Sequence, residues 1–575
     1  MVKPRALILG GGVGGLSAAH ELVTRGFDVT VIEQRTVAGG KARSLLVPDS
    51  AQPPRQPLPG EHGFRFFPHF YRHIIDTMQH TPVGGGRVAS DNLCFASREM
   101  LAVSGFPPMT FPAHKPGSPA EFLADLLAAL MDIPTLKAVG LVESDFTFFI
   151  DRLWRLMTAC PERALQEYEN LSWWDFMQAD QHSPAFRHFF VEGLTRCLVA
   201  AKASLANVRA GGVVLTQLVY GSFSTAPSFD RLLNGPTTPV WIGPWSDYLS
   251  ASQGVEFQYG TTVTAIDCDG RTVTGVQTAA ADGSTRTQTA DCYVCALPIE
   301  YTAPLLTMDI LAADPSLAGI LKIADNVYDM TGIQFYLAAD APLVNGHVLA
   351  VDSPWALTGI SQRQFWPGVD FAQLGNGQVG GILSIDISDW DAEGVIVVNP
   401  GKSPDPGGRV HYKTARECTQ DEVALEVWTQ LHRSLIQADG SCLIPPVHPL
   451  YFIDPGMVFA PTPVSNDSRL FVNQVGSWRY RPEAATAIPN FVLASDYVRT
   501  NTNLATMEAA NEAARRAVNA LLVATGSSAT PCQIWPLPVP VELEPFILFD
   551  KLRWDLGLPW NGGHPSNPSP QRQFF

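Results

Sequence analysis

Charged side chains are scarce in this chain of 575 residues. Asp, Glu, Lys and Arg together make up only 16% of it, whereas hydrophobic residues make up 46%. About a quarter of a typical soluble domain is charged, so this chain can bury a large core and also line an apolar cavity. No uninterrupted apolar run reaches the ~18 residues of a membrane-spanning helix. The length is that of two to four domains of about 150 residues each.

Positive charge is lacking as well. The 39 basic residues face 55 acidic ones, for a net charge of −16. This balance argues against nucleic acid as a partner, because phosphates require a basic surface. It also argues against electrostatic docking on anionic lipid, although a local hydrophobic patch stays compatible with peripheral membrane contact. The sequence gives no indication of oligomeric state.

The cysteines give little sign of a disulfide framework. There are nine, an odd and scattered set, and the opening 1-MVKPRALILGGG-12 runs directly into a strand and a glycine loop without a secretory signal. We therefore expect a reducing, cytoplasmic compartment. Cys292 and Cys295 form a single CxxC inside the apolar run 289-TADCYVCALP-298. We interpret them as ordinary core cysteines of a buried strand, rather than as a metal or redox pair.

The clearest motif of the sequence lies near the N-terminus, in 5-RALILGGGVGGLSAAHELVTRGFDVTVIEQ-34. An apolar strand leads into Gly10, Gly12 and Gly15, which form G-x-G-x-x-G. A helical pattern and a second strand follow, and Glu33 closes that strand. The glycines permit a tight turn, close approach of a pyrophosphate and close packing of helix on strand. The helix N-terminus attracts the phosphates, and a carboxylate 18 residues after Gly15 can accept hydrogen bonds from ribose. The order of these elements predicts a dinucleotide site.

Six residues after Glu33 comes 39-GGKARS-44. This stretch resembles the G-G-R-x-x-S/T segment of the FAD-dependent amine oxidase and carotenoid (phytoene) desaturase superfamily. The resemblance implies that FAD is the cofactor and that the segment reaches the FAD phosphates. Lys41 stands where that superfamily usually has Arg, which keeps the charge but loses the bidentate fork.

Two distant segments extend the resemblance. The stretch 490-NFVLASD-496, with a helix expected from about residue 506 to 521, looks like the superfamily's C-terminal signature. It implies that Asp496 holds the ribityl and pyrophosphate part of FAD, and that Thr506 and Met507 lie at the flavin ring on a helix N-terminus. In the centre, Gly260, Val263 and Ile266 match a G-x-x-V-x-x-I pattern, which implies that the backbone of Val263 pairs with adenine.

The predicted fold class is α/β, a Rossmann-type FAD-binding domain built from three separated segments with an interleaved α+β substrate domain. The FAD domain is expected at 1–75, 246–300 and 466–525, the substrate domain at 76–245 and 301–465, and an extended tail at 526–575. The predicted cofactor-binding residues are Gly10, Gly12, Gly14, Gly15, Glu33, Gln34, Arg35, Gly40, Lys41, Ala42, Arg43, Val263, Asp496, Thr506 and Met507. No metal site is expected.

The segment 61-EHGFRFFPHFYRH-73 mixes charges with aromatic residues. Its start, 60-GEHGF-64, resembles the G-x-H-x-F stretch of phytoene desaturases, which implies that His62 and Arg65 lie near flavin and substrate. Glu61 and His62 are candidate acid/base groups, because an apolar site can move their pKa toward neutrality. Arg65 is a candidate electrostatic anchor. The alternative for each is a structural role as the partner of a backbone group or another charge. Arg72 and His73 are expected to begin a helix on the surface.

The substrate half is less specific. Residues 118–157 have a broad apolar helical face, either a bundle core or the wall of a long tunnel. The runs 332-GIQFYLAA-339 and 379-VGGILSIDIS-388 predict strands of a sheet that roofs the flavin. The tail is proline-rich, and its aromatic end at 546–560 either packs back on the protein or contacts a hydrophobic partner.

Three functions fit these patterns. The first is a dehydrogenase or desaturase that passes hydride from an apolar, isoprenoid- or polyene-like small molecule to flavin N5. A layout shared with hydroxysqualene dehydroxylases keeps dehydroxylation open. The second is an amine or amino-acid oxidase that uses oxygen, with Trp478 and Tyr480 as a candidate aromatic cage. The third is a non-redox, isomerase-like use of reduced FAD. We favour the first, because no lysine falls in a recognisable oxygen-activating position.

Overall fold

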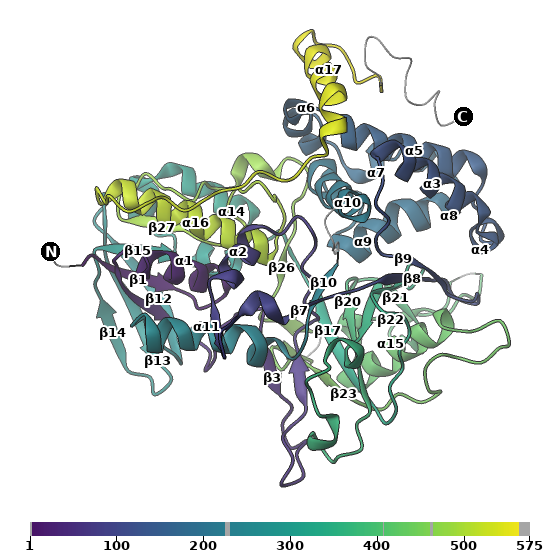
Figure 1. The fold of residues 1–575 in the computed structure, drawn as a ribbon, viewed down its shortest axis with the longest axis horizontal. Helices are drawn as coiled ribbons and strands as arrows, with labels where there is room; N and C mark the ends of the chain where they lie inside the picture. Colours follow the sequence, from purple (N-terminus) through teal and green to yellow (C-terminus); the bar gives the residue numbers. More distant parts are fainter. Residues whose placement is uncertain (1–2, 200, 225–229, 406, 460–463, 563–575) are drawn as a thin grey trace.

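Three segments far apart in the sequence build one parallel sheet. The computed structural model describes residues 3–199, 201–224, 230–405, 407–459 and 464–562. Its five-stranded sheet has the order β11 (Glu256–Gln258), β2 (Asp28–Ile32), β1 (Arg5–Leu9), β15 (Cys292–Cys295) and β27 (Phe491–Leu493). All neighbours in it pair in parallel. This is the Rossmann-type core that the sequence predicts, on the left of Figure 1.

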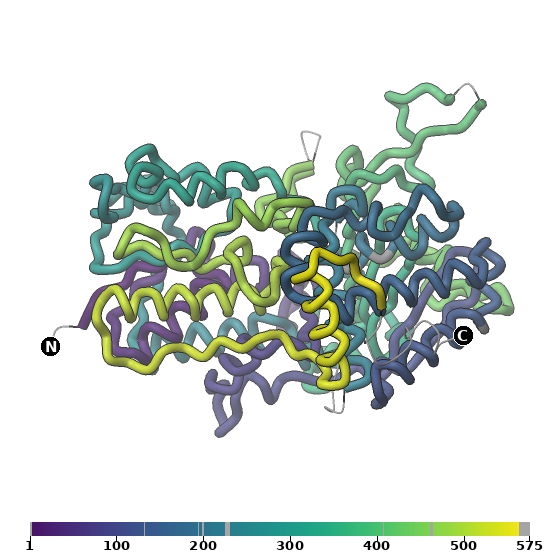
Figure 2. The backbone as a smooth tube through the Cα atoms, turned by 90° about the horizontal axis from the view of Figure 1, so that it is seen from above, coloured from purple at the N-terminus to yellow at the C-terminus, as the bar shows by residue number. Residues whose placement is uncertain are grey.

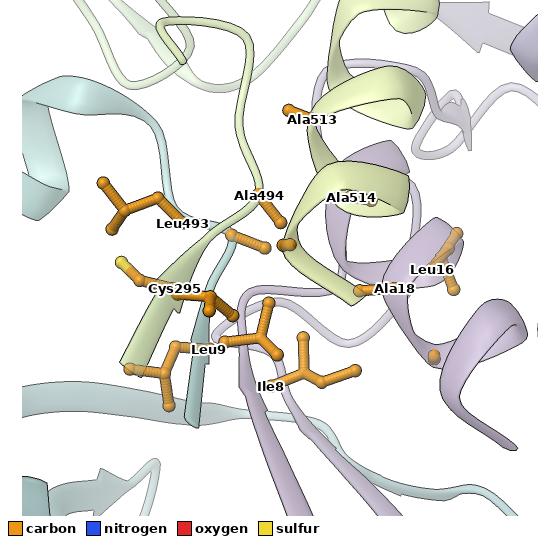
Figure 3. Packing of buried hydrophobic residues seen from close by; sticks show 14 of the residues in the cluster. Ile8, Leu9, Leu16, Ala18, Cys295, Leu493, Ala494, Ala513 and Ala514 are labelled. Atoms are coloured by element: carbon orange, nitrogen blue, oxygen red, sulfur yellow. The ribbon is translucent and has the colours of Figure 1, made fainter. Parts of the chain in front are cut away.

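Two helices pack side by side on this sheet, α1 (Val13–Val23) and α16 (Met507–Ala524). Small side chains allow the close approach, and Figure 3 shows Ala18 of α1 and Ala513 and Ala514 of α16 beside Ile8 and Leu9 of β1. Cys292 and Cys295 are buried in β15, as expected for core cysteines. The helix predicted at 506–521 is therefore confirmed and runs three residues further.

Residues 301–327, which we expected in the substrate domain, pack into the core of this first half instead. They form α13 (Met308–Ala313) and α14 (Ala318–Ile323), whose apolar residues join the same buried cluster as the parallel sheet. The physical reason is local: Ile310, Leu317, Ile320 and Ile323 are all fully buried there. The predicted boundary at 301 is displaced accordingly.

A second, seven-stranded sheet lies in the other half, at the lower right of Figure 1. Its order is β23 (Leu450–Ile453), β17 (Thr331–Leu337), β20 (Gly381–Ile387), β19 (Leu357–Ser361), β18 (Val348–Ala350), β8 (Arg98–Ala102) and β9 (Met109–Pro112). The strands predicted at 332–339 and 379–388 are β17 and β20, and every residue of both is buried. Helix α15 (Gln420–Ser434) covers this sheet through Val423, Val427 and Trp428.

Helices form the third part, above the second sheet in Figure 1. They include α3 (Pro119–Asp132), α5 (Glu143–Thr158) and α10 (Val208–Phe223). The apolar faces of α3 and α5 meet in one buried cluster with Trp173 and Phe190. Among the described residues, no helix has both the length and the hydropathy to cross a bilayer.

The C-terminal tail is extended only in part. Figure 2 shows it running beside α16 and then turning onto the helical part. There α17 (Glu544–Asp555) forms a helix that packs on α5 and α6 (Pro161–Gln166), which corrects the expectation of an extended tail throughout. The reason is a buried ion pair, with Arg163 2.9 Å from Asp550, and an edge contact of Phe546 with Trp154. The aromatic end thus packs back on the protein.

Candidate active site

One cavity of about 620 Å³ joins the two halves of the protein. On one side it is lined by the loop from β1 to α1, residues 39–42 and the start of α16. On the other it is lined by residues 62–71, by α10 and by Asp386 of β20. Ligands of open parallel α/β sheets bind outside the carboxyl ends of the strands, which is where this cavity begins.

Most predicted cofactor residues meet at the end of the cavity formed by the parallel sheet, which we call the nucleotide end. Thirteen of the fifteen border the cavity: Gly10, Gly12, Gly14, Glu33, Gln34, Arg35, Gly40, Lys41, Ala42, Val263, Asp496, Thr506 and Met507. Gly15 and Arg43 do not. The thirteen residues that border the cavity lie between Gly10 and Met507 in the chain, so only folding brings them together. Their individual contacts to a cofactor stay predictions.

The glycines are required by close packing. A Cβ at Gly15 would lie 1.9 Å from the carbonyl oxygen of Gly10, and a Cβ at Gly14 would lie 2.1 Å from that of Ala494. At Gly12, in contrast, an added Cβ would meet only Gly40 Cα at 3.8 Å. The surface at Gly12 is therefore open toward the cavity, as close approach by a pyrophosphate requires.

Glu33 is held in place by backbone groups. Its carboxylate accepts hydrogen bonds of 2.8 Å from the N–H of Gly11 and of 2.8 Å from the N–H of Arg35. Both carboxylate oxygens have further lone pairs, so a ribose hydroxyl can add to these bonds. Together with two helix N-termini on the cavity, those of α1 and α16, this donor and acceptor set fits FAD.

Arg43 differs from the expectation. Its guanidinium is buried; Nη2 donates to both carboxylate oxygens of Asp454, at 2.9 and 3.0 Å, and Nη1 donates to the carbonyl of Gly40 at 2.7 Å. Both terminal nitrogens of Arg43 therefore bond within the protein, and Arg43 does not line the cavity but shapes the 39–44 loop. Lys41 borders the cavity and contacts the carbonyl oxygen of Arg469.

Within the 61–73 segment, His62 and Arg65 line the cavity and Glu61 does not. Glu61 is buried behind the wall, where it accepts hydrogen bonds of 2.8 Å from both the N–H and the hydroxyl of Thr237. Burial raises the pKa of Glu61 to about 7, against the lowering effects of Arg65 and Thr237. The geometry therefore does not support direct contact of Glu61 with a substrate.

His62 and Arg65 are both fixed by neighbours. Nδ1 of His62 lies 3.3 Å from Oδ2 of Asp454. Burial lowers the pKa of His62, and Asp454 opposes that shift. Arg65 donates to the carbonyl of Lys41 at 2.8 Å, and burial lowers its pKa too. Arg65 thus links the 61–73 segment to the 39–44 loop.

The end of this segment corrects one expectation. Helix α2 (His73–Gln79) begins at His73 as predicted, but His73 is buried rather than on the surface. Its Nδ1 lies 2.7 Å from Glu508 Oε1, which also accepts from the backbone N–H of Arg72 and His73. This carboxylate ties α2 to the first turn of α16.

The far end of the cavity, which we call the substrate end, contains residues that sequence reasoning missed. Glu99 of β8, His347 before β18 and Asp386 of β20 all line it. Burial raises the pKa of Asp386 to about 7, and Arg65 and His347 oppose that rise. No local motif marks these positions, because they lie in separate strands and loops.

The apolar wall comes from α10, not from residues 118–157. Ala210, Gly211, Val214 and Leu218 line the cavity at helical spacing, with Phe64 and Phe66 nearby on the same wall. No described residue between 118 and 157 lines it, so their apolar faces form a bundle core. Trp478 and Tyr480 also lie outside the cavity lining. The Trp478 ring stacks with Arg209 at 3.9 Å, so the hypothesised aromatic cage is not part of the cavity.

Comparisons with known proteins agree with this architecture. Residues 8–81 match the family model of an NAD(P)-binding Rossmann-like domain. A stretch of 155 residues is 29% identical to the carotenoid phi-ring synthase of Chlorobaculum tepidum. The match spans 26% of this chain and about a quarter of that curated relative, 23% of its length.

Solved structures match over most of the chain. An oxidoreductase from Methanosarcina mazei has a TM-score of 0.53 at 14% identity, over 88% of this chain and 98% of that one. Putrescine oxidase bound to putrescine gives 0.53 at 12%, over 91% and 99%. Cyclohexylamine oxidase from Brevibacterium oxydans gives 0.53 at 13%, over 91% and 99%. Identity this low shows the fold alone, and that fold agrees with the predicted Rossmann-type domain joined to a second, mixed domain.

Proposed function

We propose that this chain is an FAD-dependent oxidoreductase of the dehydrogenase or desaturase type that acts on an apolar, isoprenoid- or polyene-like small molecule. The observation that carries the proposal is the cavity of about 620 Å³, which thirteen of the fifteen predicted FAD-binding residues and an apolar wall from α10 border together. When bound, FAD supplies a flavin ring that accepts a hydride at N5.

The residues of this chain have separate tasks in the proposal. Glu33 and the open surface at Gly12 hold the nucleotide part, and Thr506 and Met507 place the α16 N-terminus where negative charge develops. Phe64, Phe66 and α10 exclude water and orient the apolar chain. His62 lines the cavity and is positioned to take up the proton that leaves the substrate. Arg65 is the electrostatic anchor of the site.

An amine substrate is the second candidate, and two observations favour it. The solved neighbours include putrescine and cyclohexylamine oxidases, and the carboxylates Glu99 and Asp386 face the cavity. Against it stands the position of Trp478 and Tyr480 outside the cavity lining. Contact with a membrane surface stays a prediction from the sequence.

One experiment separates these candidates. The purified chain is loaded with FAD, and bound FAD is verified by absorbance and by release on denaturation. The oxidised protein is then mixed anaerobically with an acyclic polyene, with putrescine or with cyclohexylamine. We expect loss of the oxidised flavin band with the polyene only. Reduction by either amine and not by the polyene would replace the first proposal with the second.

A further inference from the structure

His347 is held between two carboxylates beside the cavity. Its Nδ1 lies 2.6 Å from Oδ2 of Asp230 and 3.7 Å from Oε2 of Glu99. Glu99 also accepts a hydrogen bond from the backbone N–H of His347, at 3.2 Å. Asp230 is completely buried just before β10 (Arg231–Leu233) and does not line the cavity, whereas His347 does. The arrangement fixes which ring nitrogen faces the carboxylates.

Two aromatic rings in the cavity wall pack against the imidazole of His347. The ring centroids of Phe64 and Phe66 lie 5.3 and 4.8 Å from that of His347, the second edge-on at 72°. Both phenylalanines line the cavity. The His347 ring is therefore restrained by packing as well as by its close contacts with the carboxylates of Asp230 and Glu99.

The charge state follows from the neighbours. Burial lowers the pKa of His347, but Asp230 and Glu99 outweigh it and raise that pKa to about 10. The other charged groups near the ring are Asp386 on β20 and, beyond it, Arg65. At neutral pH the imidazole thus carries a proton on both nitrogens.

One of the two imidazole N–H groups has no hydrogen-bond partner among the described residues. Nδ1 faces the carboxylates, while Nε2 is buried and has no hydrogen-bond partner among the residues that the structure describes. Leaving a buried donor without a partner destabilises the protein, so such a group favours a ligand that supplies an acceptor. His347 lines the cavity together with Asp386, whose Oδ1 likewise has no hydrogen-bond partner among the described residues. A molecule in this end of the cavity can therefore accept a hydrogen bond from Nε2–H of His347.

We propose that Nε2–H of His347 donates a hydrogen bond to an oxygen atom of the substrate, so that the substrate is an apolar chain that bears a hydroxyl or carbonyl group. This inference rests on the proposed function and narrows its substrate class. A pure hydrocarbon of the same shape would leave the N–H unpaired and bind more weakly. Sites built to hydrogen-bond a substrate group discriminate strongly against the analogue that lacks it.

The test uses two probes of about twenty carbons, an isoprenoid alcohol and the hydrocarbon of the same skeleton. The FAD-loaded full chain is titrated with each, and binding is followed by the change in the flavin spectrum and by calorimetry. We expect the alcohol to bind about tenfold more tightly or better, the ratio that corresponds to one hydrogen bond. His347→Phe should bind both probes equally.

Three further variants serve as controls for the role of His347 in this binding test. His347→Gln retains an N–H donor and should keep part of the preference even where His347→Phe is too unstable to study. Asp230→Asn removes the charge that orients the ring and should reduce the preference. His80→Gln, at an exposed histidine with 67% of its side chain accessible, should leave it unchanged.

The contrary outcomes are distinct. Equal binding of both probes by the unmodified chain overturns the inference and leaves the apolar-substrate proposal standing. No binding of either probe overturns both. A preference that survives in His347→Phe, with a shifted flavin spectrum, assigns Nε2 to the cofactor and overturns the inference. A stoichiometric divalent metal removed by chelator would assign Glu99, Asp230 and His347, whose ligand atoms lie within 4.8 Å of one another, to a metal site instead.

Discussion

The nucleotide end and the substrate end of the cavity are built on different principles. At the nucleotide end, Glu33 accepts hydrogen bonds from the backbone N–H of Arg35, two residues away, and of Gly11, in the glycine loop after the neighbouring strand β1, and glycines set the shape. At the substrate end, charged side chains from distant strands pair with one another, and buried atoms such as Nε2 of His347 and Oδ1 of Asp386 have no partner in the described chain. Close backbone packing shapes the nucleotide end, whereas the substrate end is a polar network whose unpartnered atoms a ligand can hydrogen-bond.

The largest expected effect is at the glycines. Gly15→Ala places a methyl carbon 1.9 Å from the Gly10 carbonyl oxygen, so β1 and α1 must separate, and we expect the free energy of unfolding to fall by about 3 kcal/mol or more. Gly12→Ala meets only Gly40 Cα at 3.8 Å and should fold normally while losing FAD. Denaturant midpoints and FAD content measure the two effects. If Gly15→Ala and Gly12→Ala lower the free energy of unfolding equally, the interpretation that Gly15 serves packing and Gly12 serves FAD binding is wrong.

His62→Ala tests the other end. A positioned proton acceptor contributes about 10²- to 10⁴-fold, so turnover should fall by at least about 100-fold while FAD stays bound. The Arg43–Asp454 pair remains in the variant and should preserve the loop. The measurement is the rate of flavin reduction in single-turnover mixing, with His80→Ala as the control. If rate and FAD content are both unchanged, His62 has a structural role only.

Glu33→Ala should weaken FAD binding without touching the substrate end. A hydrogen bond to a charged group contributes about 1.5–3 kcal/mol, so we expect the Kd for FAD to rise roughly 10- to 150-fold. Glu256→Ala, on an exposed residue of β11, is the matched control. An unaltered Kd would show that the ribose contacts lie elsewhere.

The smallest effect is a change in pH dependence at Glu61. Its pKa is raised from 4.5 to about 7, so between these values the folded chain holds a proton that the unfolded chain has released. The free energy of unfolding therefore falls as pH rises through this range. Glu61→Gln removes this contribution and should flatten the decline, seen in Tm measured from about pH 5 to about pH 8. If the Tm curves of Glu61→Gln and of the unmodified chain run parallel, the folded protein does not disfavour the ionised carboxylate of Glu61, and the prediction is wrong.

The sequence was a good guide wherever function depends on local backbone. The strands β1, β2, β15 and β27 and the helices α1 and α16 lie where the patterns indicate, and thirteen of the fifteen proposed cofactor residues border one cavity, while their contacts to a cofactor stay predictions. Periodicity could not separate a core face from a tunnel wall at 118–157, since both are apolar. It gave no indication that α10 would line the cavity, nor that Arg43 would turn toward Asp454, more than 400 residues away.

The sequence by itself determined the parallel sheet, the glycine loop and the acid that follows it. These depend on φ freedom, strand periodicity and helix N-termini, which are properties of neighbouring residues. Only the tertiary structure decided that Glu61 is behind the wall, that His73 is buried, and that Glu99, His347 and Asp386 line one end of the cavity with Asp230 against His347 behind it. The physical reason is that a pKa, an ion pair or an unpartnered donor depends on what is near in space, and four strands and loops far apart in the chain supply those neighbours.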